Sequence, residues 1–93
     1  MVKIRFGLKG ETMNVKVELY RKSGGSQSPS VYLVKVDGVL KGRLEKFPNT
    51  RTDTHPWKAF AFQNGDPMHA DKVGFFYAAD GGKKAAVAAL VNS

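Results

Sequence analysis

Alternating apolar and polar positions predict a chain built mainly of β-strands. Every second side chain is apolar from residue 2 to residue 8, and the same period of two returns over residues 13–19. A period of two is typical of a strand with one buried face. Gly10-Glu11 lies between the two segments, so we predict that they pair as an antiparallel hairpin.

A second hairpin is predicted around Asp37-Gly38, a dipeptide that favours a tight turn between paired strands. The flanking strands are residues 31–36 and 40–47. A two-residue loop would mix apolar and charged side chains on each face of this pair. A three-residue loop would instead place Tyr32 opposite Leu44 and gather the apolar side chains on one face. Because register follows the face that must be buried, we predict the three-residue loop.

The rest of the chain predicts two more strands and one helix. Residues 57–63 form an aromatic strand, and residues 73–78 form the last strand. Asp80 is a typical N-cap residue, and an Ala-rich segment with apolar side chains at helical spacing follows it. The expected fold class is α+β: a mainly antiparallel sheet of two hairpins plus two further strands, with one C-terminal helix packed on the sheet.

Size and composition indicate one folded domain over residues 1–93. A chain of 93 residues is too short for two independent cores, and 42% hydrophobic residues are too many for a disordered chain. Residues 23–30 are rich in Ser and Gly and lack any periodicity, so we predict a flexible surface loop there. Residues 48–56 are polar and framed by prolines, and they predict a second loop.

Several classes of protein are disfavoured by what the sequence lacks. The absence of Cys excludes a disulfide scaffold and a thiolate zinc site. Neither a signal-peptide core nor an apolar run of membrane-spanning length is present, so we expect a cytoplasmic protein without a membrane partner. No nucleotide-binding fingerprint or nucleophile motif occurs, and we therefore expect no cofactor and no enzymatic activity.

Two pairs of acid and histidine form the one candidate metal site. Asp53-Thr54-His55 and His69-Ala70-Asp71 could supply four ligands from two loops, and a metal in basic surroundings would suggest a nuclease. No further paired carboxylates support this hypothesis. Ordinary surface residues explain both pairs, and we predict no metal site.

The placement of charge is the most informative feature. The net charge is +7, and only Glu18 and Glu45 among the eight acids fall within predicted strands. The other acids fall in predicted turns, loops or the helix cap: Glu11, Asp37, Asp53, Asp66, Asp71 and Asp80. The predicted strands carry the bases Lys3, Arg5, Lys16, Lys35, Lys41, Arg43, Lys46 and Lys58. The exposed sheet face is therefore expected to be strongly positive, and phosphate backbones are common ligands of such faces. Alternatively, these lysines are solvated charges that prevent pairing between sheets.

Aromatic residues next to these bases suggest base stacking, with core packing as the alternative. Tyr20 precedes Arg21 and falls on the polar face of its strand, whereas Trp57 is better explained as a core residue. We assign the other large aromatic residues of the second half to the core: Phe60, Phe62, Phe75 and Phe76.

The segment Gly81-Gly82-Lys83-Lys84 is a second candidate for phosphate binding. Lysines in a first helical turn lie at the unfavourable end of the helix dipole, and a bound phosphate would account for them. The competing explanation is that the glycine pair eases the turn from strand to helix.

In the second half of the chain, two or three predicted strands precede a helix, and these strands contain Gly42-Arg43, Trp57 and Val73-Gly74-Phe75-Phe76. This layout resembles that of the plant AP2-type and integrase arm-binding DNA-binding modules. In those families the sheet enters the major groove and the helix packs behind it. The compact basic chain also resembles the small accessory proteins of phages and plasmids, which dock on a host protein or nucleoprotein.

The sequence thus predicts a small basic module that binds DNA or RNA through the sheet face and the start of the helix. The alternative is a phage- or plasmid-type accessory protein that docks on an acidic protein surface. The residues predicted to contact the nucleic acid or partner are Lys3, Arg5, Lys16, Lys35, Lys41, Arg43, Arg51, Lys58, Lys83, Lys84, Tyr20 and Trp57.

Overall fold

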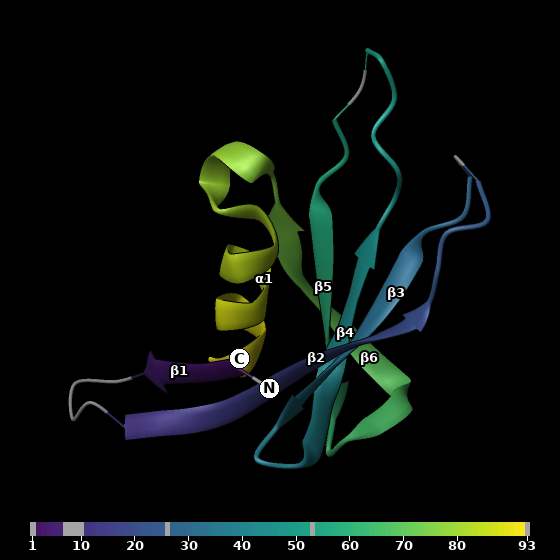
Figure 1. Cartoon of the computed structure of the whole chain (residues 1–93). Coiled ribbons are helices and arrows are strands. Elements are labelled where there is room, and N and C mark those ends of the chain that lie inside the picture. Colours follow the sequence, from purple (N-terminus) through teal and green to yellow (C-terminus); the bar gives the residue numbers. More distant parts are fainter. Residues whose placement is uncertain (1, 7–10, 26, 53, 93) are drawn as a thin grey trace.

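One antiparallel sheet and a C-terminal helix make up the part of the chain that the computed structural model describes (Figure 1). That part comprises residues 2–6, 11–25, 27–52 and 54–92, with side chains described from residue 14 onward. The sheet has six strands in sequence order: β1 (Val2–Phe6), β2 (Glu11–Arg21), β3 (Ser30–Val36), β4 (Val39–Lys46), β5 (Trp57–Gln63) and β6 (Asp66–Phe76). The 3₁₀ helix η1 (Ala78–Asp80) and the helix α1 (Gly82–Val91) follow. The predicted α+β fold class is confirmed.

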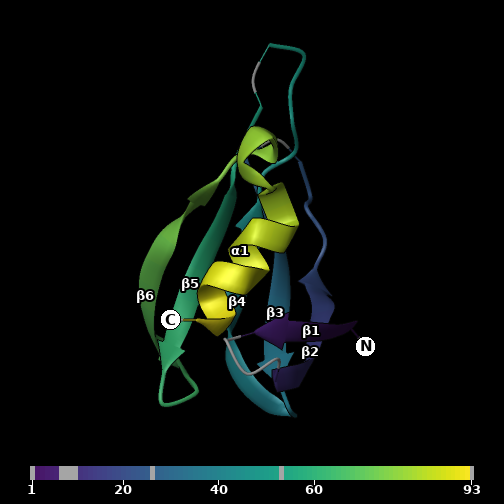
Figure 2. The same ribbon diagram turned by 90° about the vertical axis from the view of Figure 1, so that its left-hand side faces the viewer.

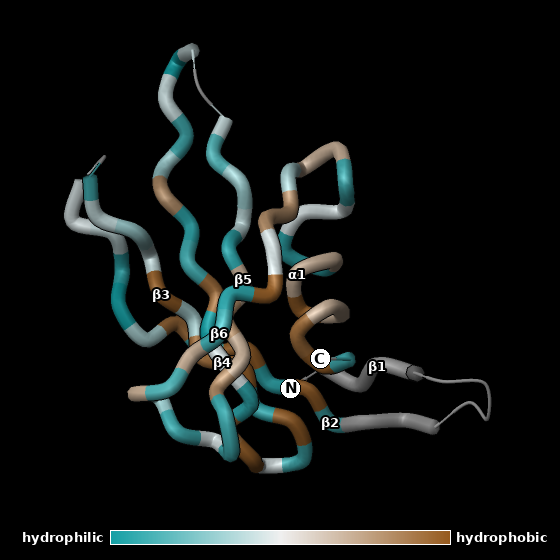
Figure 3. Tube along the Cα trace, turned by 180° about the vertical axis from the view of Figure 1, so that it is seen from behind, coloured by the Kyte–Doolittle hydropathy of each residue, from teal (hydrophilic) through white to brown (hydrophobic). Residues whose placement is uncertain are grey.

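The core lies between one face of the sheet and α1, which packs over β4, β5 and β6 (Figure 2). Val87 and Leu90 supply the buried face of α1, as their helical spacing predicts. The buried sheet residues beneath them include Val15, Val34, Leu44 and Ala59. Apolar residues occur along β3, β4 and α1, whereas the long loops after β2 and β4 are mostly hydrophilic (Figure 3).

The β3–β4 turn corrects the predicted three-residue loop. Asp37 and Gly38 have φ values of 51° and 83°, and two successive positive φ values define the two-residue hairpin turn that Asp-Gly favours. Val36 accordingly pairs with Val39 across this turn. Near the turn, the hairpin adopts the register that Asp-Gly favours. This register differs from the one that would place the apolar side chains on one face.

A bulge resolves that conflict a few residues further along. The register shifts between Val34 and Lys35, so that Tyr32 pairs with Leu44 as the buried face predicts. One extra residue on β4, Lys41, is accommodated by this shift. The predicted pairing is therefore confirmed away from the turn, whereas the loop length was wrong, together with the pairings it implied of Val36 with Leu40 and of Lys35 with Lys41.

The last strand begins seven residues earlier than predicted and ends two residues earlier. Asn64 and Gly65 form a second two-residue turn with φ values of 53° and 74°, and β6 starts directly after it at Asp66. Pro67 is compatible with β6 because this strand lies at the edge of the sheet, where a missing N–H leaves no inner ladder unpaired.

The predicted N-cap of the helix was also wrong. Asp80 is the last residue of η1, and Gly81 caps α1 without a side-chain hydrogen bond. The extra turn arises because the backbone N–H groups of Asp80 and Gly82 both donate to the carbonyl oxygen of Tyr77.

The Ser/Gly segment after β2 carries local hydrogen bonds among its described residues. The hydroxyl of Ser23 donates to the carbonyl oxygens of Gly25 and Ser28 at 2.8 and 2.6 Å. The backbone N–H of Ser23 donates to Ser30 Oγ. The flexibility of residues 23–30 stays a prediction. Among the residues described, neither helix is both long enough and apolar enough to cross a membrane.

Candidate functional site

The sheet face opposite α1 gathers bases and aromatic rings. Successive side chains of a strand point to opposite faces, so the neighbours of buried Val34, Leu44 and Ala59 point away from α1. Strand pairing aligns these neighbours across the sheet in rows. We call this surface the open face and define it by Lys16, Glu18, Leu33, Lys35, Arg43, Glu45, Lys58, Phe60, Lys72 and Phe75.

Arg43 is held at the middle of the open face by a ring and a carboxylate. Its guanidinium carbon lies 4.3 Å from the centroid of the Phe60 ring and 5.9 Å from that of Phe62. Its Nε donates to Glu45 Oε2 at 2.8 Å. These contacts orient a planar cation over an aromatic ring, a geometry that Arg adopts more readily than Lys.

Phe75 on β6 is an exposed ring that two ammonium groups approach. Lys72 Nζ lies 4.6 Å from its ring centroid, and Lys58 Nζ, on the neighbouring strand, lies 5.7 Å away. Lys58 Nζ also lies 5.1 Å from the ring centroid of Phe47. Because 48% of Phe75 remains exposed, part of this ring is available to a ligand.

Glu18 neutralises part of the positive charge at the β2–β3 side of the open face. Lys16 and Lys35 stand directly opposite each other, an unfavourable pairing of like charges that a shared carboxylate offsets. Glu18 lies 2.7 Å from Lys16 Nζ and 3.6 Å from Lys35 Nζ. The hydrogen bond from Lys16, followed by the charges of Lys16 and Lys35, lowers the pKa of Glu18.

The open face is therefore positive, but less so than the sequence predicts. Both acids predicted to lie in strands, Glu18 and Glu45, pair with bases of this face. Lys46, counted among the strand bases, instead donates to the carbonyl oxygen of Phe47 and to Asn49 Oδ1 in the next loop, and burial lowers its pKa. Among the side chains that the structure describes, the open face carries five bases and two carboxylates: Lys16, Lys35, Arg43, Lys58 and Lys72, with Glu18 and Glu45.

Three acids predicted to lie in turns or loops are strand residues. Glu11 begins β2, whereas Asp66 and Asp71 lie in β6. The sequence argument that acids avoid the strands is wrong for these positions because both strands extend further than their hydrophobic alternation.

The start of α1 lies on the other side of the sheet. Lys83 Nζ is 5.1 Å from the ring centroid of Tyr32 and 5.9 Å from that of Trp57. The two rings pack together at 5.4 Å against the core, as the core interpretation of Trp57 predicts. Lys83 is thus engaged with core aromatic rings, and the exposed Lys84 follows it. The structure does not bring these lysines together with the open face.

Other predicted contact residues are scattered. Arg51 is exposed in the loop after β4, Lys41 lies at the β4 bulge, and Tyr20 is 69% exposed at a bulge in β2. Lys3 and Arg5 lie on β1, and their side chains fall outside the described residues.

The sequence interpretation missed Lys72 and misassigned two rings. Lys72 fell in a segment interpreted as a loop, although the Asn64-Gly65 turn could have indicated a hairpin. Phe60 and Phe75 were assigned to the core and lie on the open face instead. Phe76 packs against the core as predicted. Phe62 is buried.

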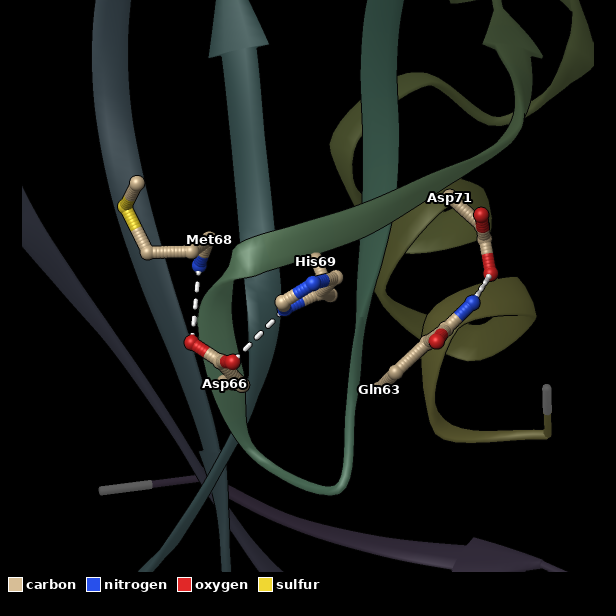
Figure 4. Close-up of polar contacts among 5 residues, drawn as sticks. All are labelled: Gln63, Asp66, Met68, His69 and Asp71. Carbon is tan, nitrogen blue, oxygen red and sulfur yellow. Dashed lines mark hydrogen bonds and ion pairs between the residues drawn. The ribbon is translucent and has the colours of Figure 1, made fainter.

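The β5–β6 turn holds a polar cluster around a shallow cavity of about 310 Å³ lined by Gln63, Asn64, Asp66 and His69 (Figure 4). Asp66 Oδ1 accepts the backbone N–H of Met68, and Oδ2 lies 2.7 Å from His69 Nδ1; these two contacts, in that order, lower the pKa of Asp66. The side-chain amide of Gln63 donates to Asp71.

The two histidines of the candidate metal site, His55 and His69, do not meet in the fold. His55 precedes β5 and His69 follows the turn at its other end, and a strand of seven residues spans roughly 20 Å. The backbone N–H of His55 donates to Asn49 Oδ1, and Asp53 lies outside the described residues. His55 and His69 therefore cannot ligate the same ion, which removes the geometric basis of the nuclease hypothesis.

Comparisons of the chain with protein-family models, with curated proteins and with solved structures find no match. In the structure, α1 follows β4, β5 and β6 and packs on them, and the resemblance to the AP2-type and arm-binding modules stays an expectation from the sequence. Such a layout describes an architecture and assigns no function. The residues of the open face are consequently the basis for assigning a function.

Proposed function

We propose that this protein binds nucleic acid through the open face. The observation that carries the proposal is the exposed ring of Phe75 with the ammonium groups of Lys58 and Lys72 5.7 and 4.6 Å from its centroid. Ammonium groups bind phosphates and aromatic rings stack on bases, so this arrangement offers both kinds of contact in one place.

The charge of the molecule supports the same ligand. The net charge of +7 attracts a polyanion at long range, and the surplus of bases over carboxylates on the open face provides local contacts. Arg43 and Glu45 leave a cation fixed in the middle of this surface, whereas Lys58 and Lys72 carry long side chains that can turn from a ring to a phosphate.

A matched pair of charge variants tests the proposal. Lys72 and Lys84 are both exposed, and replacing either with Glu changes the net charge equally, but Lys72 lies on the open face and Lys84 at the start of α1. Fluorescence anisotropy with labelled single-stranded DNA, single-stranded RNA and duplex DNA at two salt concentrations measures the binding.

Lys72→Glu is expected to weaken binding and to reduce the slope of log K against log salt by about 0.7–0.9 for each lost phosphate contact. Lys84→Glu is expected to have the smaller effect of reduced net charge alone. Binding that does not respond to salt, or equal losses in the two variants, would contradict the proposal.

A protein partner is the second candidate function. Leu19 and Tyr20 are adjacent on β2 with 54% and 69% of their surface exposed, and an exposed apolar and aromatic pair is a feature of interface cores. In this case the chain acts as a small accessory protein that docks on an acidic protein surface. Association with one defined protein that survives nuclease treatment and is lost in Tyr20→Ala supports this function; loss after nuclease treatment returns the assignment to nucleic acid.

A further inference from the structure

The chemistry of Phe75 limits the kind of nucleic acid that can use it. A phenyl ring has no group that donates or accepts a conventional hydrogen bond, so it cannot recognise a phosphate or a base edge through hydrogen bonds. Its face can stack on the face of a base. In a duplex the base faces are covered by their neighbours, and only edges and backbone are exposed. An exposed phenyl ring is therefore useful to a ligand whose bases are unpaired.

The surroundings of Phe75 fit one nucleotide of a single strand. Lys72 and Lys58 approach the ring from two adjacent strands, with their ammonium groups 4.6 and 5.7 Å from its centroid. A base on the exposed part of the ring would displace these flexible side chains outward, toward the phosphates on either side of the stacked base. The same two lysines then contact the Phe75 ring in the free protein and the phosphates of the nucleic acid in the complex.

A second stacking position lies beside the first. Phe60 pairs with Lys72, and Phe75 pairs with Lys58, so the two rings are diagonal neighbours on β5 and β6. Arg43 covers Phe60 at 4.3 Å and is fixed by Glu45, which presents the guanidinium group itself as a planar surface. Guanidinium planes and aromatic rings both stack on unpaired bases. Neighbouring bases of one strand can thus occupy Phe75 and Arg43.

We infer that the open face binds single-stranded nucleic acid, with one unpaired base stacked on Phe75 and the next on Arg43. This inference rests on the proposed function and deepens it. It also departs from the resemblance to the AP2-type and arm-binding modules, which implies entry of the sheet into the major groove of a duplex.

Phe75→Ala tests the inference against a control of nearly equal exposure. Tyr77 is 47% exposed, compared with 48% for Phe75, and lies just beyond the end of β6. Dissociation constants are measured for labelled oligothymidylate, oligouridylate and a DNA hairpin duplex with wild type, Phe75→Ala and Tyr77→Ala. Circular dichroism melting of each variant establishes that the fold is intact.

Phe75→Ala is expected to weaken single-strand binding about 5- to 150-fold, the range for one base–aromatic stack, without changing the salt slope because no charge is removed. Tyr77→Ala is expected to leave binding unchanged. Phe75→Trp, which keeps a stacking surface, is expected to retain the binding that Phe75→Ala loses. Its tryptophan fluorescence is expected to be quenched by the single strands.

The failures of the two proposals give different results. If the protein binds none of the three probes, the proposed function is wrong and this inference falls with it. If the duplex binds as tightly as the single strands and Phe75→Ala loses nothing, nucleic-acid binding stands and the single-strand inference is overturned.

Discussion

Gly42 lies where a side chain of α1 approaches the sheet closely. A Cβ atom at this position would lie 2.2 Å from the carbonyl oxygen of Phe60 and 2.8 Å from Leu90 Cδ1. The first of these atoms belongs to the backbone of the neighbouring strand, so it cannot turn aside as a side chain can. The absence of a side chain at residue 42 therefore sets how tightly Leu90 packs against the sheet.

Gly42→Ala is expected to destabilise the protein. Replacing Gly with Ala usually stabilises by about 0.4–1 kcal/mol where the backbone permits, but overpacking costs about 1–3 kcal/mol, so the clash decides the sign. The melting temperature should fall by about 4–8 °C for each kcal/mol lost, as measured by circular dichroism. Gly24→Ala is the control, because a Cβ atom there meets nothing within 4 Å. Equal melting temperatures for wild type and Gly42→Ala would contradict this account.

The aromatic residues show where sequence interpretation fails at the scale of single residues. On β5 the core takes Ala59, whose small side chain suits the close approach of α1, while the neighbouring Phe60 faces outward. Both faces of β5 carry apolar side chains, so their alternation does not reveal which face is buried. Size suggests that Phe belongs inside, and only the position of the helix reverses that assignment.

At the scale of elements, turn chemistry predicted the β3–β4 hairpin, and burial predicted most of its register. Asp37-Gly38 fixed the two-residue turn, whereas Tyr32 and Leu44 fixed the pairing beyond the bulge. The start of β6 was missed because Pro67 suggests a loop unless the strand is known to be at an edge. The position of a strand within the sheet is a tertiary property that local sequence does not carry.

The pairing of β2 with β3 leads to a prediction about Glu18. Its pKa is held below the ordinary value of a glutamate, first by the hydrogen bond from Lys16 and then by the charges of Lys16 and Lys35. A lowered folded-state pKa stabilises the fold above the unfolded-state pKa, and this contribution is lost as the pH falls through the folded-state pKa. Lys16→Gln is expected to raise the midpoint of the Glu18 titration, followed by NMR of the side-chain carboxyl carbon.

A neutral side chain at residue 84 provides the comparison for that titration, because Lys84→Gln removes the same charge on the opposite side of the sheet. Its Glu18 midpoint is expected to remain near that of wild type. If Lys16→Gln and Lys84→Gln move the midpoint equally, overall charge rather than the local ion pair controls Glu18.

In the whole molecule, the residues that stabilise the fold and the residues proposed to bind nucleic acid lie on opposite faces of the sheet. The helix and the core residues occupy one face of the sheet, and the bases and rings of the open face occupy the other. Charge and composition could suggest a nucleic-acid ligand, but the sequence placed Lys83 and Lys84 in the same site as the sheet bases. The sheet lies between these two groups, which is a consequence of how α1 folds back onto β4, β5 and β6.

Leu90→Ala tests whether α1 and the sheet unfold together, and whether binding on the open face is independent of the core. Leu90 is fully buried between α1 and the sheet, and its truncation is expected to cost about 2–5 kcal/mol. Trp57 is the one tryptophan of the chain and packs against that core, so its fluorescence reports on the docking of α1, while far-UV circular dichroism reports on the whole fold. Both melting transitions should move down together and coincide, as in a cooperative two-state domain.

At temperatures where the variant is folded, its affinity for single-stranded probes should equal that of wild type. A fluorescence transition that precedes the circular dichroism transition would instead show that α1 undocks independently, and a loss of affinity in the folded variant would show that the two faces are coupled through the sheet.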